Sequence, residues 1–258
     1  MEVFLLKLIA TPLLVGAASL AGRRWGAEVG GWLVGIPFTS GPIALFLALD
    51  SGREFAAQAA NGILAGTVSQ AAFAVAYAWI ALRAGWPVSL VAATAAFLGV
   101  TFVMDFIRVD PWLTFAMAIG SLAVALAVMP RGRAPVAGSR QAPAWDIPAR
   151  MVVATAFVIA LTAAAPGLGA HLAGLLAPFP LYATVLSVFA QRLTGAGSAI
   201  AVLRGLLTGL FAFALFFVAV AVLLVPAGIA IAFAAALVLA LAAQGASLAL
   251  SRRSRLAA

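Results

Sequence analysis

The sequence predicts an all-α polytopic membrane protein, and three observations lead to this fold class. The chain of 258 residues is 66% hydrophobic and only 9% charged, with a mean hydropathy of +1.18. Soluble domains carry about 25% charged residues. Apolar runs of about 20 residues, the length that crosses a bilayer as a helix, recur along the whole chain. Apolar and polar residues do not alternate, which excludes a transmembrane β-barrel.

We expect nine transmembrane helices with short connections between them. Their approximate ranges are 3–22, 29–49, 55–82, 86–104, 112–129, 150–166, 170–190, 199–225 and 227–250. The first run resembles a signal peptide, but Arg23 and Arg24 follow it rather than precede it, so we expect it to be retained as a span. Between residues 86 and 129, the sequence MDFIRVDP also fits a re-entrant turn.

The placement of basic residues predicts the orientation of these spans. With the N-terminus outside, eleven of the fifteen Lys and Arg residues fall in inside segments, three in outside segments and one, Arg204, within a span. Cytoplasmic loops carry an excess of Lys and Arg, so the asymmetry favours an N-out and C-in topology. The long connection 130–149 is rich in Pro, Gly and Arg and is typical of a solvated linker.

The chain contains an internal duplication with an offset of 143 residues. Residues 26–66 align without a gap on residues 169–209, and the identities include matched glycines and the pair Pro37/Pro180. Because five spans precede the second copy, that copy enters the membrane from the opposite side. We therefore expect a first repeat of four helices (1–110), a bridging helix and basic linker (111–149), and an inverted second repeat of four helices (150–258). Inverted repeats are typical of secondary transporters.

Two matched spans carry proline near their middle, at Pro37 and Pro180. Proline removes a backbone donor and clashes with the preceding turn, so we expect each span to kink or break there. Thr39 and Ser40 follow the first break, and Tyr182 follows the second. Hydroxyl groups and unwound backbone at this depth can bind a solute, with a helix N-terminus pointing at it. A proline kink that serves only packing stays an open alternative.

The third span has a polar face formed by Glu54, Gln58 and Asn61, spaced i, i+4 and i+7. A polar stripe of this kind faces the protein interior or water. Asn61 aligns with Arg204 in the second copy. Two interpretations of Arg204 stay open: pairing with a substrate or another residue inside the bundle, or an anchor that extends to the inner surface.

Both copies carry a GxxxG pattern at matched positions, Gly62–Gly66 and Gly205–Gly209. Small residues at this spacing let two helix backbones approach closely. We expect these glycines to pack the third and eighth spans, against each other or against the broken helices, and not to contact a ligand.

The second copy resembles the small GlpM-type membrane proteins through Gly174, Phe179, Pro180, Arg204 and Gly205. Proteins of that family are about the size of one copy, so this chain looks like a fused pair. The first copy departs from the pattern, since Asn61 replaces the arginine. The resemblance implies a bacterial inner-membrane setting and a family linked to alginate production, with no particular chemistry.

The leading functional hypothesis is a secondary transporter or flippase-like carrier of a small polar or anionic metabolite. The alternative is a non-transporting accessory subunit of an envelope-polysaccharide or lipid pathway. An intramembrane enzyme ranks third, because no acid, base or metal constellation is visible; one histidine and no cysteine argue against a metal site, and no cofactor is expected. The expected partners are the lipid bilayer and a small-molecule substrate, with a homodimer left open. The arginines form no basic patch with interleaved aromatics, which argues against nucleic-acid binding.

Overall fold

The computed structural model describes residues 2–34, 37, 40–50, 52–107, 109–131, 145–153, 155–156 and 179–256. Within these residues all regular structure is helical, which confirms the all-α prediction. Four helices are long and apolar enough to cross a membrane: α4, α5, α6 and the Ala196–Ala246 part of α9. The described part of the chain therefore has the helices of a membrane protein, whereas nine spans and inverted repeats remain predictions.

The helices follow one another with short connections. Their bounds are α1 Glu2–Trp25, α2 Ala27–Val34, α3 Ser40–Asp50, α4 Arg53–Ala81, α5 Trp86–Phe106, α6 Pro111–Val128, α8 Leu181–Thr194 and α9 Ala196–Leu256. A further helical stretch covers residues 146–153. The expected span 150–166 and the linker 130–149 lie largely outside the described residues. Of the expected span 170–190, residues 179–190 are described, most of them in α8.

Three expected spans contain or adjoin a break in the structure. The range 29–49 is two short helices, α2 and α3, separated around Pro37, where a kink or break was expected. The ranges 199–225 and 227–250 correspond to two helices that the bounds of α9 enclose and that join across a kink at Gly228 (φ 83°, ψ 172°), two residues after Pro226. Proline cannot donate to the preceding turn, and glycine adopts the positive φ that reverses the chain. The region 86–129, in contrast, forms two separate helices, α5 and α6.

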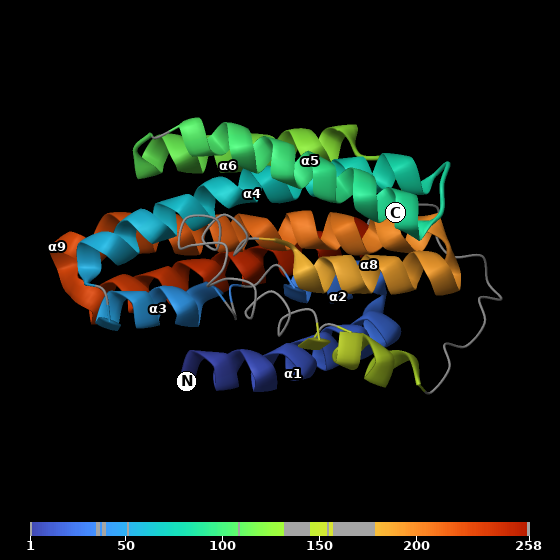
Figure 1. The fold of residues 1–258 in the computed structure, drawn as a ribbon, viewed down its shortest axis with the longest axis horizontal. Helices are drawn as coiled ribbons and strands as arrows, with labels where there is room; N and C mark the ends of the chain where they lie inside the picture. Colours follow the sequence, from blue (N-terminus) through green and yellow to red (C-terminus); the bar gives the residue numbers. More distant parts are fainter. Residues whose placement is uncertain are drawn as a thin grey trace.

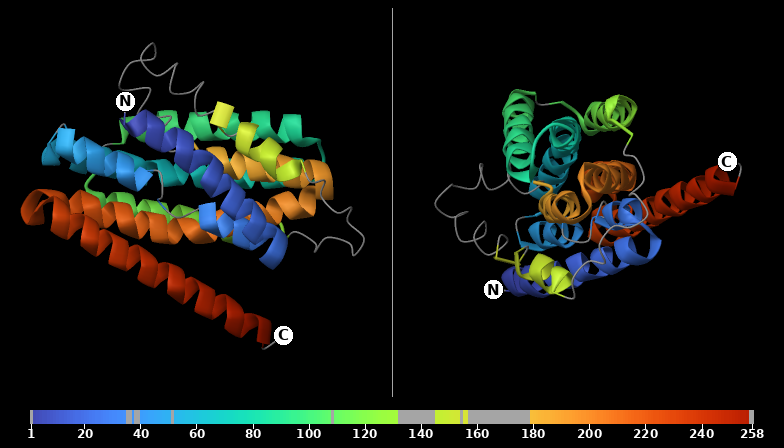
Figure 2. Two further views of the ribbon diagram at one scale, coloured as in Figure 1. Left: turned by 90° about the horizontal axis from the view of Figure 1, so that it is seen from below. Right: turned by 90° about the vertical axis from the view of Figure 1, so that its right-hand side faces the viewer.

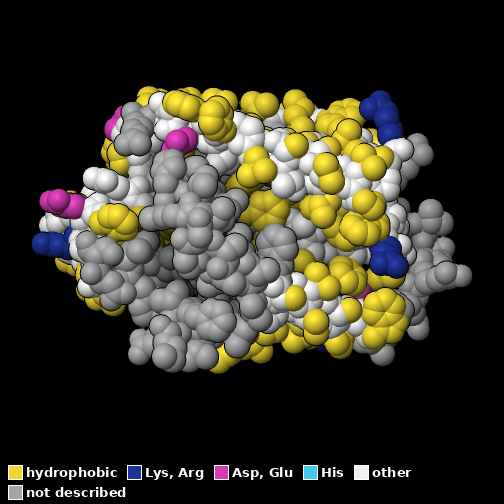
Figure 3. Space-filling view, viewed as in Figure 1, with side chains coloured by type: hydrophobic (Ala, Val, Ile, Leu, Met, Phe, Trp, Pro, Cys, Tyr) yellow, Lys and Arg dark blue, Asp and Glu magenta, His cyan; other side chains and the backbone are white. Residues whose placement is uncertain are grey.

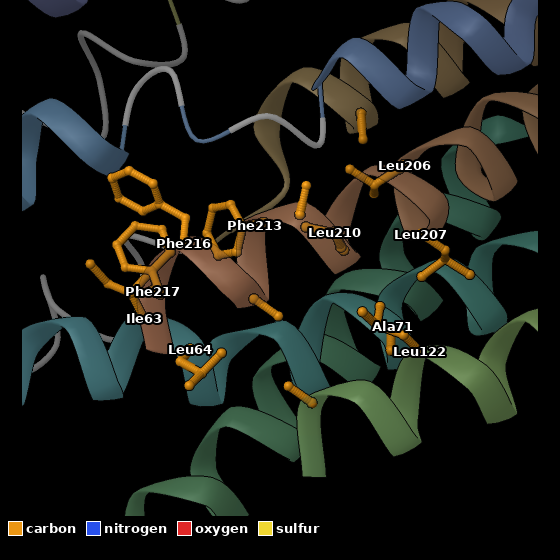
Figure 4. Packing of buried hydrophobic residues seen from close by; sticks show 14 of the residues in the cluster. Ile63, Leu64, Ala71, Leu122, Leu206, Leu207, Leu210, Phe213, Phe216 and Phe217 are labelled. Atoms are coloured by element: carbon orange, nitrogen blue, oxygen red, sulfur yellow. The ribbon is translucent and has the colours of Figure 1, made fainter. Parts of the chain in front are cut away.

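The centre of the bundle is formed by α4 and the first half of α9, which run antiparallel to one another (Figure 1). α5 and α6 cover one side of this pair, and α1 and α2 lie on the other side (Figure 2). Leu64, Leu207 and Phe217 are among the fully buried side chains where α4 meets α9 (Figure 4). A buried hydrogen bond of 2.8 Å from Thr101 Oγ1 to Ser69 Oγ joins α5 to α4.

The two ends of the bundle differ in charge. We call the end where α1, α4, α6 and α8 finish the basic end, because Arg23, Arg24, Arg83, Arg131 and Arg192 lie in or just beyond those last turns. We call the opposite end, where α4 and α6 begin, the acidic end, because it holds Glu54, Asp105 and Asp110 together with Arg53. Figure 3 shows dark blue side chains at its right edge and magenta ones at its left edge.

Candidate functional site

The first break lies between α2 and α3. Pro37 is buried, and the Gly41 amide donates to the Pro37 carbonyl at 2.9 Å, which closes the turn that starts α3. Ser40, the first residue of α3, is half-buried. Thr39 lies outside the described residues. The expected helix break at Pro37 is therefore present, since α2 ends at Val34 and α3 begins at Ser40.

The first break is covered by an aromatic cluster of α9. A Cβ built on Gly41 would lie 3.3 Å from Phe216 Cζ, so a larger residue here would force the Phe216 ring to shift. Phe216 in turn packs edge-on against Phe217, with ring centroids 5.1 Å apart, and against Phe233 at 6.1 Å. Figure 4 shows Phe216 pointing toward the start of α3. The break thus rests on the second half of the chain.

The second break is seen from Phe179 onward. Pro180 is buried with φ −78° and ψ 58°, and the Leu181 amide donates to the Phe179 carbonyl at 2.7 Å. These values define an inverse γ-turn. The amide and the hydroxyl of Thr184 both donate to the Pro180 carbonyl, at 2.8 and 2.9 Å. α8 therefore begins directly after Pro180, and Tyr182 lies half-buried in its first turn.

Phe179 is held between two aromatic rings of the first half. Its ring lies edge-on to Phe73 of α4, with centroids 5.8 Å apart, and to Phe97 of α5 at 5.3 Å. Both partners are fully buried. Tyr77, one turn after Phe73, is also fully buried, and its hydroxyl has no hydrogen-bond partner among the described residues. The second break thus contacts the rings of Phe73 and Phe97, and the buried Tyr77 hydroxyl lies one turn from Phe73.

The two breaks are covered in a reciprocal way. Phe73 and Phe216 are separated by 143 residues, the offset of the internal duplication. Phe73, in the first half, contacts the break of the second half through Phe179, and Phe216, in the second half, contacts the break of the first half at Gly41. Sequence reasoning missed this pair, although the offset already aligned the two phenylalanines.

Glu54 and Gln58 do not join the breaks. Both are exposed in the first turns of α4, at the acidic end. Their neighbour Arg53 donates through Nη1 to the Val225 carbonyl at 3.3 Å, close to the bend of α9. Among the described residues no contact links these side chains to Pro37 or Pro180, and their part in substrate binding stays a prediction.

Asn61 and Arg204 contact the two ends of α6 instead. Asn61 Nδ2 donates to the Val109 carbonyl at 3.0 Å, just before α6 begins. Arg204 Nη1 donates to the carbonyls of Leu126 and Met129, at 3.2 and 3.3 Å, where α6 ends. Cations favour a helix C-terminus because its last carbonyls have no partner in the helix. Both side chains therefore bind backbone, and their place in a substrate site stays a prediction.

The GxxxG glycines differ in their surroundings. Gly66, Gly205 and Gly209 are buried in the helices α4 and α9, which pack on each other. Gly62 is exposed, and a Cβ built there meets no atom within 4 Å. No close approach within the described chain therefore depends on Gly62, and the packing role of the other three stays a prediction.

A buried carboxylate at the basic end was not singled out from the sequence. Asp146 is fully buried and accepts from Arg23 at 3.0 Å and from Arg150 through two nitrogens, each at 3.0 Å. The i, i+4 spacing of Asp146 and Arg150 was a signal that could have identified half of this cluster. The ion pairs of Asp146 link the end of α1 to the start of the helical stretch 146–153. No group of three or more His, Cys, Asp or Glu side chains that could hold a metal is found in the described part of the chain.

In comparisons with known proteins, no family model, no curated protein and no solved structure matches this chain. The site is therefore interpreted from its own geometry.

Proposed function

We propose that the chain is a carrier of a small polar or anionic solute that works by alternating access between two inverted repeats. The observation that supports this proposal most is the reciprocal contact of the two breaks: Phe216 covers the break at Pro37, and Phe73 contacts Phe179 at the break before α8. When each repeat holds the broken helix of the other, a rocking motion of one repeat moves both breaks together.

Two further features support inverted repeats. Gly52 and Gly195, which are 143 residues apart, precede α4 and α9 with nearly the same backbone, φ 91° and ψ 162° against φ 95° and ψ 174°. The pairs α3–α4 and α8–α9 run in opposite directions through the bundle (Figure 1). We extend this symmetry to nine spans, with α6 as the bridge between the repeats. The weak resemblance of the second repeat to GlpM-type proteins is compatible with a fused duplication.

The charge difference between the two ends supports the N-out and C-in orientation. The basic end carries the arginines that the positive-inside rule places in the cytoplasm. In this orientation α1 begins outside and α9 ends inside. The setting we propose is a bacterial inner membrane.

The solute would bind between the breaks. There the N-termini of α3 and α8 place the positive ends of two helix dipoles, which favour an anion. Pro37, Thr39, Ser40, Pro180 and Tyr182 belong to this region by position. Glu54, Gln58, Asn61 and Arg204 have other contacts or exposed positions, so we assign them a smaller part.

An accessory subunit of an envelope-polysaccharide or lipid pathway is the second candidate. One observation favours it: after Gly228, the second half of α9 turns away from the first half (Figure 2), and it exposes an apolar face with Ile231, Val238 and Leu241. A partner subunit could cover this exposed face. On this hypothesis no solute passes between the breaks.

Single cysteines distinguish the two candidates, since the sequence contains no native cysteine. Ser40→Cys and Tyr182→Cys are placed in membrane vesicles of both orientations and labelled with an impermeant maleimide. Alternating access predicts that each cysteine is labelled from both sides, at rates that change when a transported solute is added. Glu54→Cys and Arg192→Cys, at the acidic and basic ends, serve as controls that are labelled from one side only. Labelling of the break cysteines from a single side, or from neither, would contradict the carrier.

A further inference from the structure

The corner where α4, α6 and α9 meet at the basic end contains a concentration of unmatched positive charge. Arg204 reaches this corner from α9 and binds the Leu126 and Met129 carbonyls of α6 through Nη1. A guanidinium has five N–H donors, and Nε and Nη2 of Arg204 make no hydrogen bond with any described residue. The side chain is half-buried and has no carboxylate within ion-pair distance in the described chain.

Two more arginines adjoin this corner. Arg83 lies just past the end of α4, four residues after Trp79, and Arg131 lies two residues after Met129. Both are exposed and take part in no ion pair of the described residues. Trp79 links the end of α4 to the end of α6, because its indole N–H donates to the Val128 carbonyl at 3.2 Å. Arg204 thus binds the end of α6, and Arg83 and Arg131 follow the last turns of α4 and α6.

No ion pair of the described residues balances these charges. Of the seven acidic residues, five belong to helix ends at the acidic end: Glu2, Asp50, Glu54, Asp105 and Asp110. Asp146 is already bound by Arg23 and Arg150. Glu28 lies near the start of α2, on the side of the bundle opposite α6 (Figure 2). The segment 132–144 that follows Arg131 contains no acidic residue. An external anion would therefore find no competing carboxylate of the described chain at this corner.

The surroundings of the corner define what kind of anion fits. The last turns of α6 expose apolar side chains, with Val124 61% and Val128 47% exposed, so this face meets lipid chains. Trp79 is 42% exposed beside it, and tryptophan at this position marks the membrane interface. The Cα–Cβ bond of a helical residue tilts toward the helix N-terminus, which for Arg204 is the basic end. The charges thus lie at headgroup level next to a lipid-facing helix.

We propose that this corner binds the phosphate of an anionic phospholipid. Arg204 donates to the phosphate through the nitrogens that α6 does not use, since guanidinium and phosphate form paired hydrogen bonds. Arg83 and Arg131 flank the headgroup, and the acyl chains lie along the exposed face of α6. Basic pockets between transmembrane helices bind lipid headgroups in this way. The site does not depend on whether the chain carries a solute.

The test measures retention of phosphatidylglycerol by the purified full chain in a neutral detergent, with native mass spectrometry and thermal unfolding as readouts. Phosphatidylcholine with the same acyl chains is the comparison lipid. We expect phosphatidylglycerol to be retained and to raise the unfolding temperature more than phosphatidylcholine does. The double variant Arg83→Gln/Arg131→Gln removes two side chains that make no hydrogen bond or ion pair with the described residues. It should weaken retention about 25-fold, at about fivefold for each basic residue lost near an anionic headgroup.

The matched control is Arg24→Gln/Arg53→Gln, which removes the same charge from the end of α1 and from the start of α4, away from this corner. It should retain phosphatidylglycerol like the parent chain. Equal loss in both double variants would overturn the site, because retention would then follow net charge alone. Equal stabilisation by soluble glycerol phosphate would overturn it too, since the site would then take a free anion. Arg204→Gln adds a further check, read only as lipid retention by the fraction that stays folded.

Discussion

Asn61 and Arg204 hold opposite ends of the same helix. The amide of Asn61 donates to the Val109 carbonyl before α6, and the guanidinium of Arg204 donates to the Leu126 and Met129 carbonyls at its end. The two residues are 143 positions apart, so the side chains that bind the two ends of α6 occupy equivalent positions in the two proposed repeats. α6 is therefore fastened to both halves of the chain through its backbone.

Removing the arginine should cost more than removing the asparagine. Arg204→Met leaves two carbonyls of α6 without a donor, and we expect a loss of about 1–2 kcal/mol in unfolding free energy. Asn61→Leu should be nearly neutral, because it also removes the Asn61 Oδ1 atom, which is buried without a partner in the described chain. Unfolding in detergent followed by tryptophan fluorescence measures both. A larger effect at Asn61 than at Arg204 would contradict the assignment.

Asp146 should be the most sensitive charged residue at the basic end. Asp146→Asn leaves Arg23 and Arg150 without their carboxylate, and breaking a fully buried ion pair costs about 3–5 kcal/mol. Arg23 is 39% exposed, so water compensates part of this loss, and we expect about 2–3 kcal/mol. Arg23→Gln should have a smaller effect, since the two-nitrogen contact of Arg150 remains. Thermal unfolding of the three proteins tests this order.

The sequence predicted the helical class, the break at Pro37 and the charge difference between the ends, because these depend on local composition. Hydropathy did not predict which faces pack. In a chain this apolar, the exposed Val124 and the fully buried Leu122 are both aliphatic, so hydropathy does not distinguish an outer face from a packed one. The sequence showed where polar residues lie along the chain but not their partners. Asn61 and Arg204 bind backbone carbonyls, and every residue has a carbonyl, so no residue type marks the partner. The aromatic contacts of Phe179 likewise depend on how three helices meet.

Glycine substitutions should separate backbone strain from packing. Gly52 and Gly195 have positive φ, which costs a residue with a Cβ about 1–2 kcal/mol, so Gly52→Ala and Gly195→Ala should destabilise by about that amount. Gly62→Ala is the control: its Cβ meets nothing, and alanine favours a helix over glycine by about 1 kcal/mol. Thermal unfolding should rank Gly62→Ala at or above the parent chain. A destabilised Gly62→Ala would indicate a close contact that the monomer does not contain.

Phe73 and Phe179 should be energetically coupled. Edge-on aromatic pairs contribute about 0.5–1.5 kcal/mol beyond buried area. A double-mutant cycle with Phe73→Leu and Phe179→Leu should return a coupling in that range. Val152→Leu, an exposed change on another helix, should be additive with either substitution. If the effects of the Phe73 and Phe179 substitutions add with no coupling energy, the result would contradict a stabilising contact between α4 and the second break.

The reciprocal contact at the first break should be rescued by making room in α9. In Gly41→Leu the new Cβ would lie 3.3 Å from Phe216 Cζ, which crowds this ring, so we expect a loss of about 1–3 kcal/mol. Phe216→Ala alone leaves a cavity and destabilises by about 3–5 kcal/mol. In the double variant the leucine occupies part of that cavity. The double variant should therefore lose less unfolding free energy than the sum of the losses of the two single variants. Simple additivity would mean that Phe216 does not cover the break at Pro37, and the proposed coupling of the two halves would then lose one of its two contacts.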